Sequence, residues 1–251
     1  MREAWLNGSW YYAVGGFFNG FWDQNRNVIE DFPVTSDQKH WMALDWGFSA
    51  PFAVAFMCRD FEGRVIMYDE IYGYGGEGNR GSKKTATEVA HMIQDKVEFY
   101  EKAGIEFRGN IADSAIFNRM GGETSIFEDF LAEGVVWQPS GKGKGSRVSG
   151  WNAVREAMRT GKFVVTRKCP HTIRTIPLQM PDEKNPDDID TLGEDHMADA
   201  IRYALVHVLP MSRKTKKDKK YAPGSFGYLL AQGTKKEEHD YQLFDTIGYL
   251  N

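Results

Sequence analysis

The sequence has few cysteines and no long apolar run, and these absences exclude several classes of protein. Its 251 residues include only two cysteines, Cys58 and Cys169, too few for a disulfide framework. Cys169 and His171 flank Pro170, but no second Cys/His pair completes a zinc site. No apolar stretch is long enough to span a membrane, so we expect no membrane partner. With 41% hydrophobic residues, the chain can bury a core.

The net charge is also small, but the charge is unevenly distributed. The formal net charge is −4 at pH 7. Residues 213–220 are strongly basic, whereas residues 182–195 are rich in Asp and Glu. Local fields decide binding, so a near-neutral total does not exclude a nucleic-acid partner.

The hydrophobic pattern predicts an α/β fold with a mixed sheet of five or more strands flanked by helices. Three consecutive strands are expected first, at 41–45, 53–58 and 65–71, with antiparallel pairing. Helices then alternate with strands that we expect to be parallel. The later strands are predicted at 105–112, 135–137 and 163–166. Capping boxes at Thr85 and Ser125 predict the starts of two helices, and further helices are expected around 151–160, after Pro170 and over 194–209.

Three regions are expected along the chain. Residues 1–40 are linker-like and packed on the core, residues 41–210 form the folded domain, and residues 211–251 form a basic, partly disordered tail. The glycine-rich segment 73–84 is predicted to be a mobile loop.

Three aspartates stand at or within the apolar elements. Asp45 ends the first predicted strand, Asp113 follows the strand at 105–112, and Asp199 lies in the last helix. A buried carboxylate is costly without a cation, and several together would take up protons or a metal ion. Since functional groups gather where strands end, we predict that Asp45, Asp113 and Asp199 are catalytic metal ligands. Asp195 shares a helix face with Asp199 and is a fourth candidate ligand.

An oxygen-only donor set indicates Mg²⁺ or Mn²⁺. Two such ions, about 3.5–4 Å apart, can clamp the attacking and leaving oxygens of an in-line phosphoryl displacement. Glycoside hydrolysis needs only two carboxylates, one of them a proton donor, and fits a third, helix-borne acid less well. Each aspartate taken alone could instead cap a turn or complement a helix dipole.

Three motifs resemble the nuclease domain of the large terminase of tailed bacteriophages. Met-Ala-Leu-Asp-Trp-Gly at 42–47 resembles its first acidic motif, and Ile-Ala-Asp-Ser-Ala at 111–115 resembles its second. The segment 194–204 resembles the third, whose core is Asp-Ala-x-Arg-Tyr. The segment 2–18 is similar to the stretch that joins the ATPase motor to the nuclease, so the resemblance covers roughly residues 1–209.

This resemblance implies an RNase H-like fold and a metal-dependent endonuclease that cuts concatemeric double-stranded DNA during viral genome packaging. It implies Asp45, Asp113 and Asp199 as the metal ligands. It also implies the terminase ATPase domain, the small terminase subunit and the portal protein as partners, in the cytoplasm of the infected bacterial host. No Gly-x-x-x-x-Gly-Lys-Ser/Thr motif is present, so we expect an excised C-terminal domain without the motor.

Basic segments supply candidate contacts to DNA. The Gly/Lys loop 140–147 precedes a predicted helix, where backbone amides and cationic side chains can contact phosphates without reading bases. Arg202 could either orient Asp199 or meet a phosphate. The basic run 213–220 would add salt-dependent affinity. The candidate DNA-binding residues are Lys142, Lys144 and Arg147, with Arg202, Lys214, Lys216 and Lys217 as further candidates.

Three alternatives remain open. A Holliday-junction resolvase or transposase-like nuclease would keep the fold and prefer branched DNA. An actin-like nucleotide-binding domain would need further glycine-rich phosphate loops, and 73–81 is the single candidate. A non-catalytic module that docks on DNA or the portal would bind without cutting.

Overall fold

The computed structural model describes residues 15–31, 33–119, 124–141 and 145–209. Its strands are β1 (Val28–Ile29), β2 (Lys39–Asp45), β3 (Ala53–Arg59), β4 (Val65–Tyr72), β5 (Ile111–Ala112), β6 (Gln138–Pro139) and β7 (Phe163–Thr166). Its helices are α2 (Gln24–Asn27), α3 (Ala86–Glu101), α4 (Ile126–Ala132), α5 (Ser146–Arg159), α6 (Pro170–Thr175) and α7 (His196–Val208), with 3₁₀ turns η1 (Ser114–Phe117) and η2 (Ile176–Leu178).

The strands form one mixed sheet in the order β1-β7-β4-β3-β2-β5-β6. Strand β3 pairs in antiparallel fashion with β2 on one side and with β4 on the other. Strand β5 then pairs in parallel with β2, β6 with β5, and β7 with β4. The predicted mixed sheet, antiparallel first and parallel later, is therefore confirmed.

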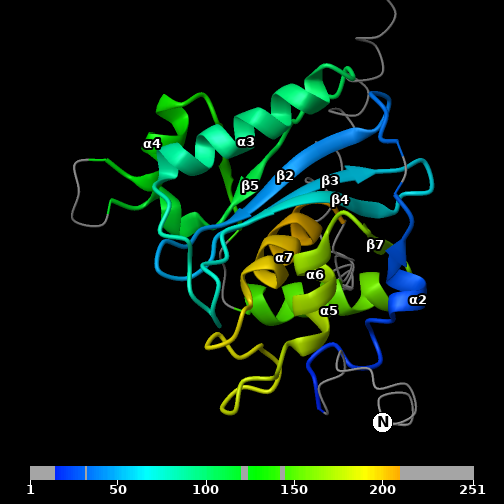
Figure 1. The fold of residues 1–251 in the computed structure, drawn as a ribbon. Coiled ribbons are helices and arrows are strands. Elements are labelled where there is room, and N and C mark those ends of the chain that lie inside the picture. The colour runs from blue at the N-terminus through cyan, green and yellow to red at the C-terminus, as the bar shows by residue number, and fades with distance from the viewer. Residues whose placement is uncertain (1–14, 32, 120–123, 142–144, 210–251) are drawn as a thin grey trace, which may run out of the picture. The chain divides into compact units, whose positions relative to one another are not determined.

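Helices cover both faces of the sheet, so the central strands are apolar on both sides. Helix α3 lies over one face, and α5, α6 and α7 lie over the other (Figure 1). Along β2, Trp41 and Ala43 face the α5–α7 side, while Met42 and Leu44 face the α3 side. Both faces of β2 are therefore covered, and its less buried end residues, Lys39 and Asp45, carry the charged groups.

Two predicted strands are shorter or displaced. The strand expected at 105–112 is reduced to β5, because Gly109 has a φ of 72° and interrupts the extended backbone. Asn110 instead accepts a hydrogen bond from the Met42 amide at 3.0 Å through its side chain. The strand predicted at 135–137 is wrong in its position, because the strand of this region is β6, at Gln138–Pro139. The Val135 amide donates a hydrogen bond to the Phe130 carbonyl at 2.9 Å at the end of α4, so sheet pairing begins only at Gln138.

Local capping signals are confirmed. Thr85 and Ser125 both form complete capping boxes, with Glu88 and Glu128 as the reciprocal partners. The predicted strand at 163–166 coincides with β7. Each of these features depends on a few neighbouring residues, which is why the sequence alone predicts them.

The described part of the N-terminal segment contributes to the core. Phe17 and Phe18 pack edge-to-face on the buried Trp151 of α5, with ring centroids 5.7 and 6.0 Å away. Strand β1 adds an edge to the sheet beside β7. Residues 1–14 and 210–251 lie outside the described residues, and so does the predicted tail. No helix within the described ranges is long and apolar enough to cross a membrane.

The glycine-rich segment 73–84 is held in place rather than free. The Gly81 amide donates to the Ser49 carbonyl at 2.7 Å. A Cβ at Gly81 would lie 2.2 Å from the Ala50 carbonyl oxygen, so this close approach requires glycine. The segment therefore brings the side chain of Asn79 to a fixed position near the α7 N-terminus, where it contacts His196.

Candidate active site

Asp45 and Asp113 lie at the ends of neighbouring strands. Asp45 is the last residue of β2, and Asp113 follows β5 directly. Leu44 of β2 is paired in parallel register with Ala112 of β5, and the Asp113 amide donates to the Leu44 carbonyl at 3.1 Å. The two aspartates therefore emerge side by side at one edge of the sheet.

Helix α7 brings two further carboxylates toward this edge. The helix packs on β2 and β3, on the face opposite α3. Asp195 is its N-cap, and Asp199 lies one turn later, its amide donating to the Asp195 carbonyl at 2.9 Å. Only 5% of Asp195 and 6% of Asp199 is exposed, and buried carboxylates at this depth require cationic or hydrogen-bonding partners.

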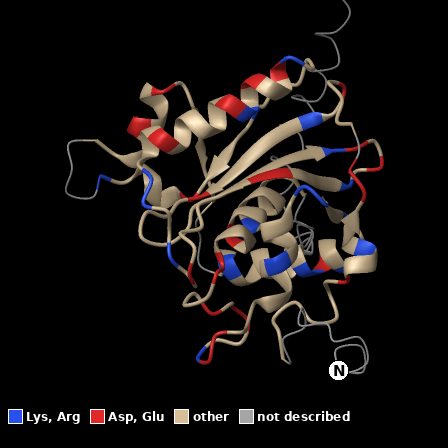
Figure 2. Ribbon diagram, in the orientation of Figure 1, with Lys and Arg blue, Asp and Glu red and all other residues tan. Residues whose placement is uncertain are grey.

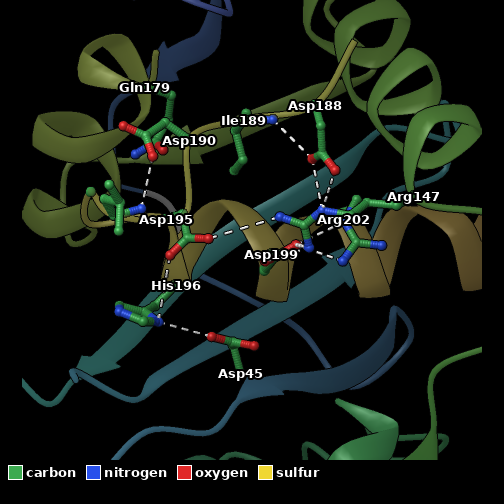
Figure 3. A network of polar contacts seen from close by, with 12 residues as sticks. Asp45, Arg147, Gln179, Asp188, Ile189, Asp190, Asp195, His196, Asp199 and Arg202 are labelled. Carbon is green, nitrogen blue, oxygen red and sulfur yellow. Dashed lines mark hydrogen bonds and ion pairs between the residues drawn. The ribbon is translucent and has the colours of Figure 1, made fainter. Parts of the chain in front are cut away.

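Two arginines provide those partners for Asp199 (Figure 3). Arg202 donates from Nε and Nη2 to one Asp199 oxygen at 2.8 and 2.6 Å. Arg147 of α5 donates from Nη1 to both oxygens at 3.2 and 3.0 Å. The Arg147 Nε is held by Asp188 at 2.7 and 2.8 Å, and its Nη2 lies 3.9 Å from Asp195. Asp199 is thus neutralised by two guanidinium groups.

His196 joins Asp45 to the glycine-rich loop. Its Nδ1 lies 3.0 Å from Asp45 Oδ2, and its Nε2 lies 2.9 Å from Asn79 Oδ1. The Asn79 amide nitrogen donates to the Gly193 carbonyl at 2.7 Å, so its oxygen accepts and His196 Nε2 carries a hydrogen. The Nδ1–Asp45 contact then holds one proton, either on the ring beside a carboxylate or on Asp45 beside a neutral ring.

The acids perturb one another electrostatically. Burial, opposed by the hydrogen bond and charge of His196 and assisted by the charges of Asp199 and Asp113, raises the pKa of Asp45 to about 6. Burial and the charge of Asp199 raise the pKa of Asp195 to about 7. Burial lowers the pKa of His196, but the hydrogen bond to Asp45 and the surrounding carboxylates outweigh it, so that pKa is raised. Such mutual repulsion favours additional positive charge at this edge.

The carboxylates are nevertheless not gathered into a metal-binding group. Within the described ranges, no three or more His, Cys, Asp or Glu side chains are arranged to hold a metal ion. Guanidinium groups occupy the oxygens of Asp199, and His196 occupies one oxygen of Asp45. The all-oxygen donor set suits a hard divalent cation, but here the cations that meet these oxygens belong to the protein.

The predicted DNA-binding residues divide into two groups. Arg147 and Arg202 both form hydrogen bonds with the carboxylate of Asp199. Of the two roles proposed for Arg202, this contact corresponds to the orientation of Asp199. The remaining candidates lie outside the described residues and stay predictions: Lys142, Lys144, Lys214, Lys216 and Lys217.

Sequence reasoning missed three residues that support the site. Asp188 anchors Arg147 and also accepts from Trp151 Nε1 at 2.7 Å. Asn79 orients His196, and the Tyr203 hydroxyl lies 3.4 Å from Asp45 Oδ1. Asp188 and Asn79 sit in loops without local periodicity, so no sequence signal marks them. Tyr203 belongs to the third motif and could have been identified from it.

The chain has the fold of the nuclease domain of phage large terminases, and the predicted fold class is confirmed. A match to the large terminase of a thermophilic bacteriophage has a TM-score of 0.60 at 22% identity and covers 81% of this chain and 48% of that chain. The nuclease domain of the P22 large terminase matches with a TM-score of 0.59 at 17% identity, over 78% of this chain and 93% of that chain.

A third match is the large terminase nuclease of the thermophilic phage G20c, a structure with bound magnesium. Its TM-score is 0.52 at 13% identity, over 77% of this chain and 98% of that chain. Our chain thus spans about half the length of the first of these terminases and most of the two separate nuclease domains. No protein-family model and no curated protein sequence matches it.

Proposed function

We propose that this chain is a divalent-metal-dependent DNA endonuclease, the nuclease domain of a phage large terminase. The observation that carries the proposal is the meeting of Asp45 and Asp113 at one sheet edge with Asp199 presented by α7, within this fold. Two acids at the ends of paired parallel strands, with a third acid from a helix packed beside them, suit metal-dependent phosphodiester hydrolysis.

In this proposal Asp45, Asp113 and Asp199 hold the divalent ions, with Asp195 as a fourth oxygen donor. Two bound Mg²⁺ or Mn²⁺ ions would supply an activated water and charge stabilisation at the departing oxygen. The protein's own groups prepare the site. Arg202 keeps Asp199 oriented from the same helix, and His196 holds the proton that it shares with Asp45, ready to exchange it with a water at the sheet edge.

The wider role follows from the same proposal. Double-stranded DNA in concatemeric form is the proposed substrate, cut during genome packaging in the cytoplasm of the infected bacterial host. The proposed partners are the terminase ATPase domain, the small terminase subunit and the portal protein. Lys142, Lys144 and the basic residues of 213–220 are proposed to contact DNA phosphates.

Nicking of supercoiled plasmid tests this proposal. The wild-type chain is incubated with Mn²⁺, with Mg²⁺ and with EDTA, beside Asp45→Asn, Asp113→Asn and Asp199→Asn. We expect metal-dependent nicking that each substitution abolishes, while Asp95→Asn, an exposed acid on α3, retains it. Retention of full activity by a folded Asp199→Asn variant would remove that residue from the site. Preference for a four-way junction over linear duplex would assign a resolvase instead.

A non-catalytic docking module is the second candidate. It is favoured by one observation, the engagement of Asp199 by Arg147 and Arg202 in place of a metal-binding group. Calorimetric measurement of Mn²⁺ binding to wild type and to Asp199→Asn distinguishes the endonuclease from the docking module. DNA binding with no metal uptake and no nicking would support the docking module.

A further inference from the structure

A cavity lies at the end of β2 opposite Asp45. Its volume is about 670 Å³, and its lining includes Lys39 and Trp41 of β2, Arg59 of β3 and His207 of α7. Six residue steps along β2 at about 3.4 Å each place Lys39 roughly 20 Å from Asp45. The cavity is therefore separate from the acidic edge, and its size is typical of a site for a small ligand.

Cationic side chains outnumber carboxylates at this cavity. Lys39 and Arg59 are directly opposite each other in the antiparallel register of β2 and β3. Figure 2 shows Lys and Arg in blue on these adjoining strand ends. Like charges in directly opposite positions destabilise a sheet, and neither residue has an ion-pair partner in the described part of the chain. Such an arrangement is stabilised when an anion binds between the two.

The other residues that line the cavity do not neutralise its positive charge. Arg108 adds a third cation, and Glu106, with which it forms a salt bridge, is the one carboxylate among the lining residues. The neighbouring Asp60 is engaged by Arg64 at 2.7 Å. Three cationic side chains thus face one carboxylate.

Trp41 provides an independent indication of a ligand. Only 4% of this residue is exposed, it lines the cavity, and its indole Nε1 has no hydrogen-bond partner among the described residues. A buried indole N–H usually finds an acceptor, and leaving it unpaired is destabilising. The cavity is therefore lined by three cations and bordered by a tryptophan whose buried indole N–H is unpaired within the described ranges.

We propose that this cavity is an anion site that takes a phosphate group, either of a nucleotide or of the DNA backbone. A phosphate accepts several hydrogen bonds at once, and guanidinium and ammonium groups are its usual partners in proteins. Lys39 and Arg59 bind its charge, and the Trp41 indole donates to one of its oxygens. The proposal stands independently of the cutting reaction, because it uses none of the acidic residues.

Calorimetry without divalent metal tests the site on the full chain. The probes are inorganic phosphate, adenosine monophosphate and a short DNA duplex, each titrated into wild type, Lys39→Gln, Arg59→Gln and Lys162→Gln. Lys162 is an exposed lysine outside the cavity and serves as the charge-matched control. We expect at least one probe to bind wild type and to bind about tenfold more weakly to Lys39→Gln and Arg59→Gln, with Lys162→Gln unchanged.

The probe that binds identifies the source of the phosphate. Binding of phosphate or the nucleotide indicates a small ligand, whereas binding of the duplex alone indicates the DNA backbone. Trp41→Phe, which keeps the ring and removes the donor, is expected to weaken binding severalfold without unfolding the protein. The proposal is overturned if no probe binds wild type, or if Lys162→Gln weakens binding as much as Arg59→Gln does.

Discussion

The two ends of strand β2 carry opposite charges, and they differ in how those charges are satisfied. At the Asp45 end, carboxylates on β2 and α7 contact His196, Arg147 or Arg202 from the same chain. At the Lys39 end, two cations face each other across the strand pair, and no acid in the described part of the chain pairs with them. Internal partners satisfy one end, whereas the cations of the other end remain available to a partner from outside.

The two ends of β2 therefore illustrate two kinds of binding site, one whose charges are already paired within the protein and one whose charges are unpaired in the described part of the structure. At Asp199 a new cation would replace a guanidinium group of Arg147 or Arg202, so binding there is an exchange. Lys39 and Arg59 have no such competitor among the described residues, and anion binding between them would relieve their repulsion directly. Removing the paired charge of Asp199 should therefore destabilise the protein, whereas removing the unpaired charge of Lys39 should stabilise it, and the following predictions test that contrast.

The largest effect is expected at Asp199. Asp199→Asn removes the charge that neutralises Arg147 and Arg202, and breaking a buried pair in this way costs about 3–5 kcal/mol. The free energy of unfolding, measured by urea denaturation, should fall by that order. Nicking by the folded variant, assayed well below its melting temperature, should fall at least about a hundredfold. An unchanged denaturation midpoint would show that the arginines are satisfied elsewhere.

A pH-dependent effect is expected at Asp195. Its pKa is raised to about 7 and that of Asp45 to about 6, so the folded protein keeps protons that the unfolded chain releases near pH 4. The stability that these two groups contribute is present below about pH 4 and is lost as pH rises to 7. Asp195→Asn should raise the melting temperature at pH 8 by roughly 5 °C or more and flatten its fall between pH 5 and 8.

The control for this prediction is Asp95→Asn, which removes an exposed carboxylate of α3. Its melting temperature should follow the wild-type pH profile. If Asp195→Asn also follows the wild-type profile, the repulsion between Asp195 and Asp199 does not limit stability.

A smaller effect concerns the exchange of cations at Arg147. Arg147→Gln removes a positive charge from both Asp199 and the vicinity of Asp195, so Mn²⁺ affinity in calorimetry should rise about tenfold, or about 1.4 kcal/mol. Arg159→Gln, an exposed arginine on the same helix, is the matched control. Weaker Mn²⁺ binding to Arg147→Gln would mean that Arg147 organises the acids instead of competing for them.

The smallest effect is expected at the basic end. Lys39→Gln removes one member of the like-charged pair, so in phosphate-free buffer the free energy of unfolding should increase by about 0.2–1 kcal/mol. Lys162→Gln should leave it unchanged. Destabilisation by Lys39→Gln would end the contrast between the two ends of β2.

Local features of the fold could be predicted from the sequence, whereas its longer connections could not. The capping boxes at Thr85 and Ser125 depend on three-residue spacings, and both appear in the structure. The strand predicted at 105–112 is mostly absent, because a positive φ at Gly109 cannot be read from hydrophobicity. The contact of Arg147 with Asp199 joins residues 52 positions apart, and no local pattern encodes it.

The sequence by itself determined which acids end apolar elements, because burial of the flanking residues leaves Asp45 and Asp113 at strand ends. It also determined the amphipathic helix that carries Asp199. Only the tertiary structure decided what these acids touch, because the parallel pairing of β2 with β5 and the packing of α5 beside α7 bring Arg147 and His196 to them. The same packing placed Lys39 opposite Arg59, since strand register sets which charges meet.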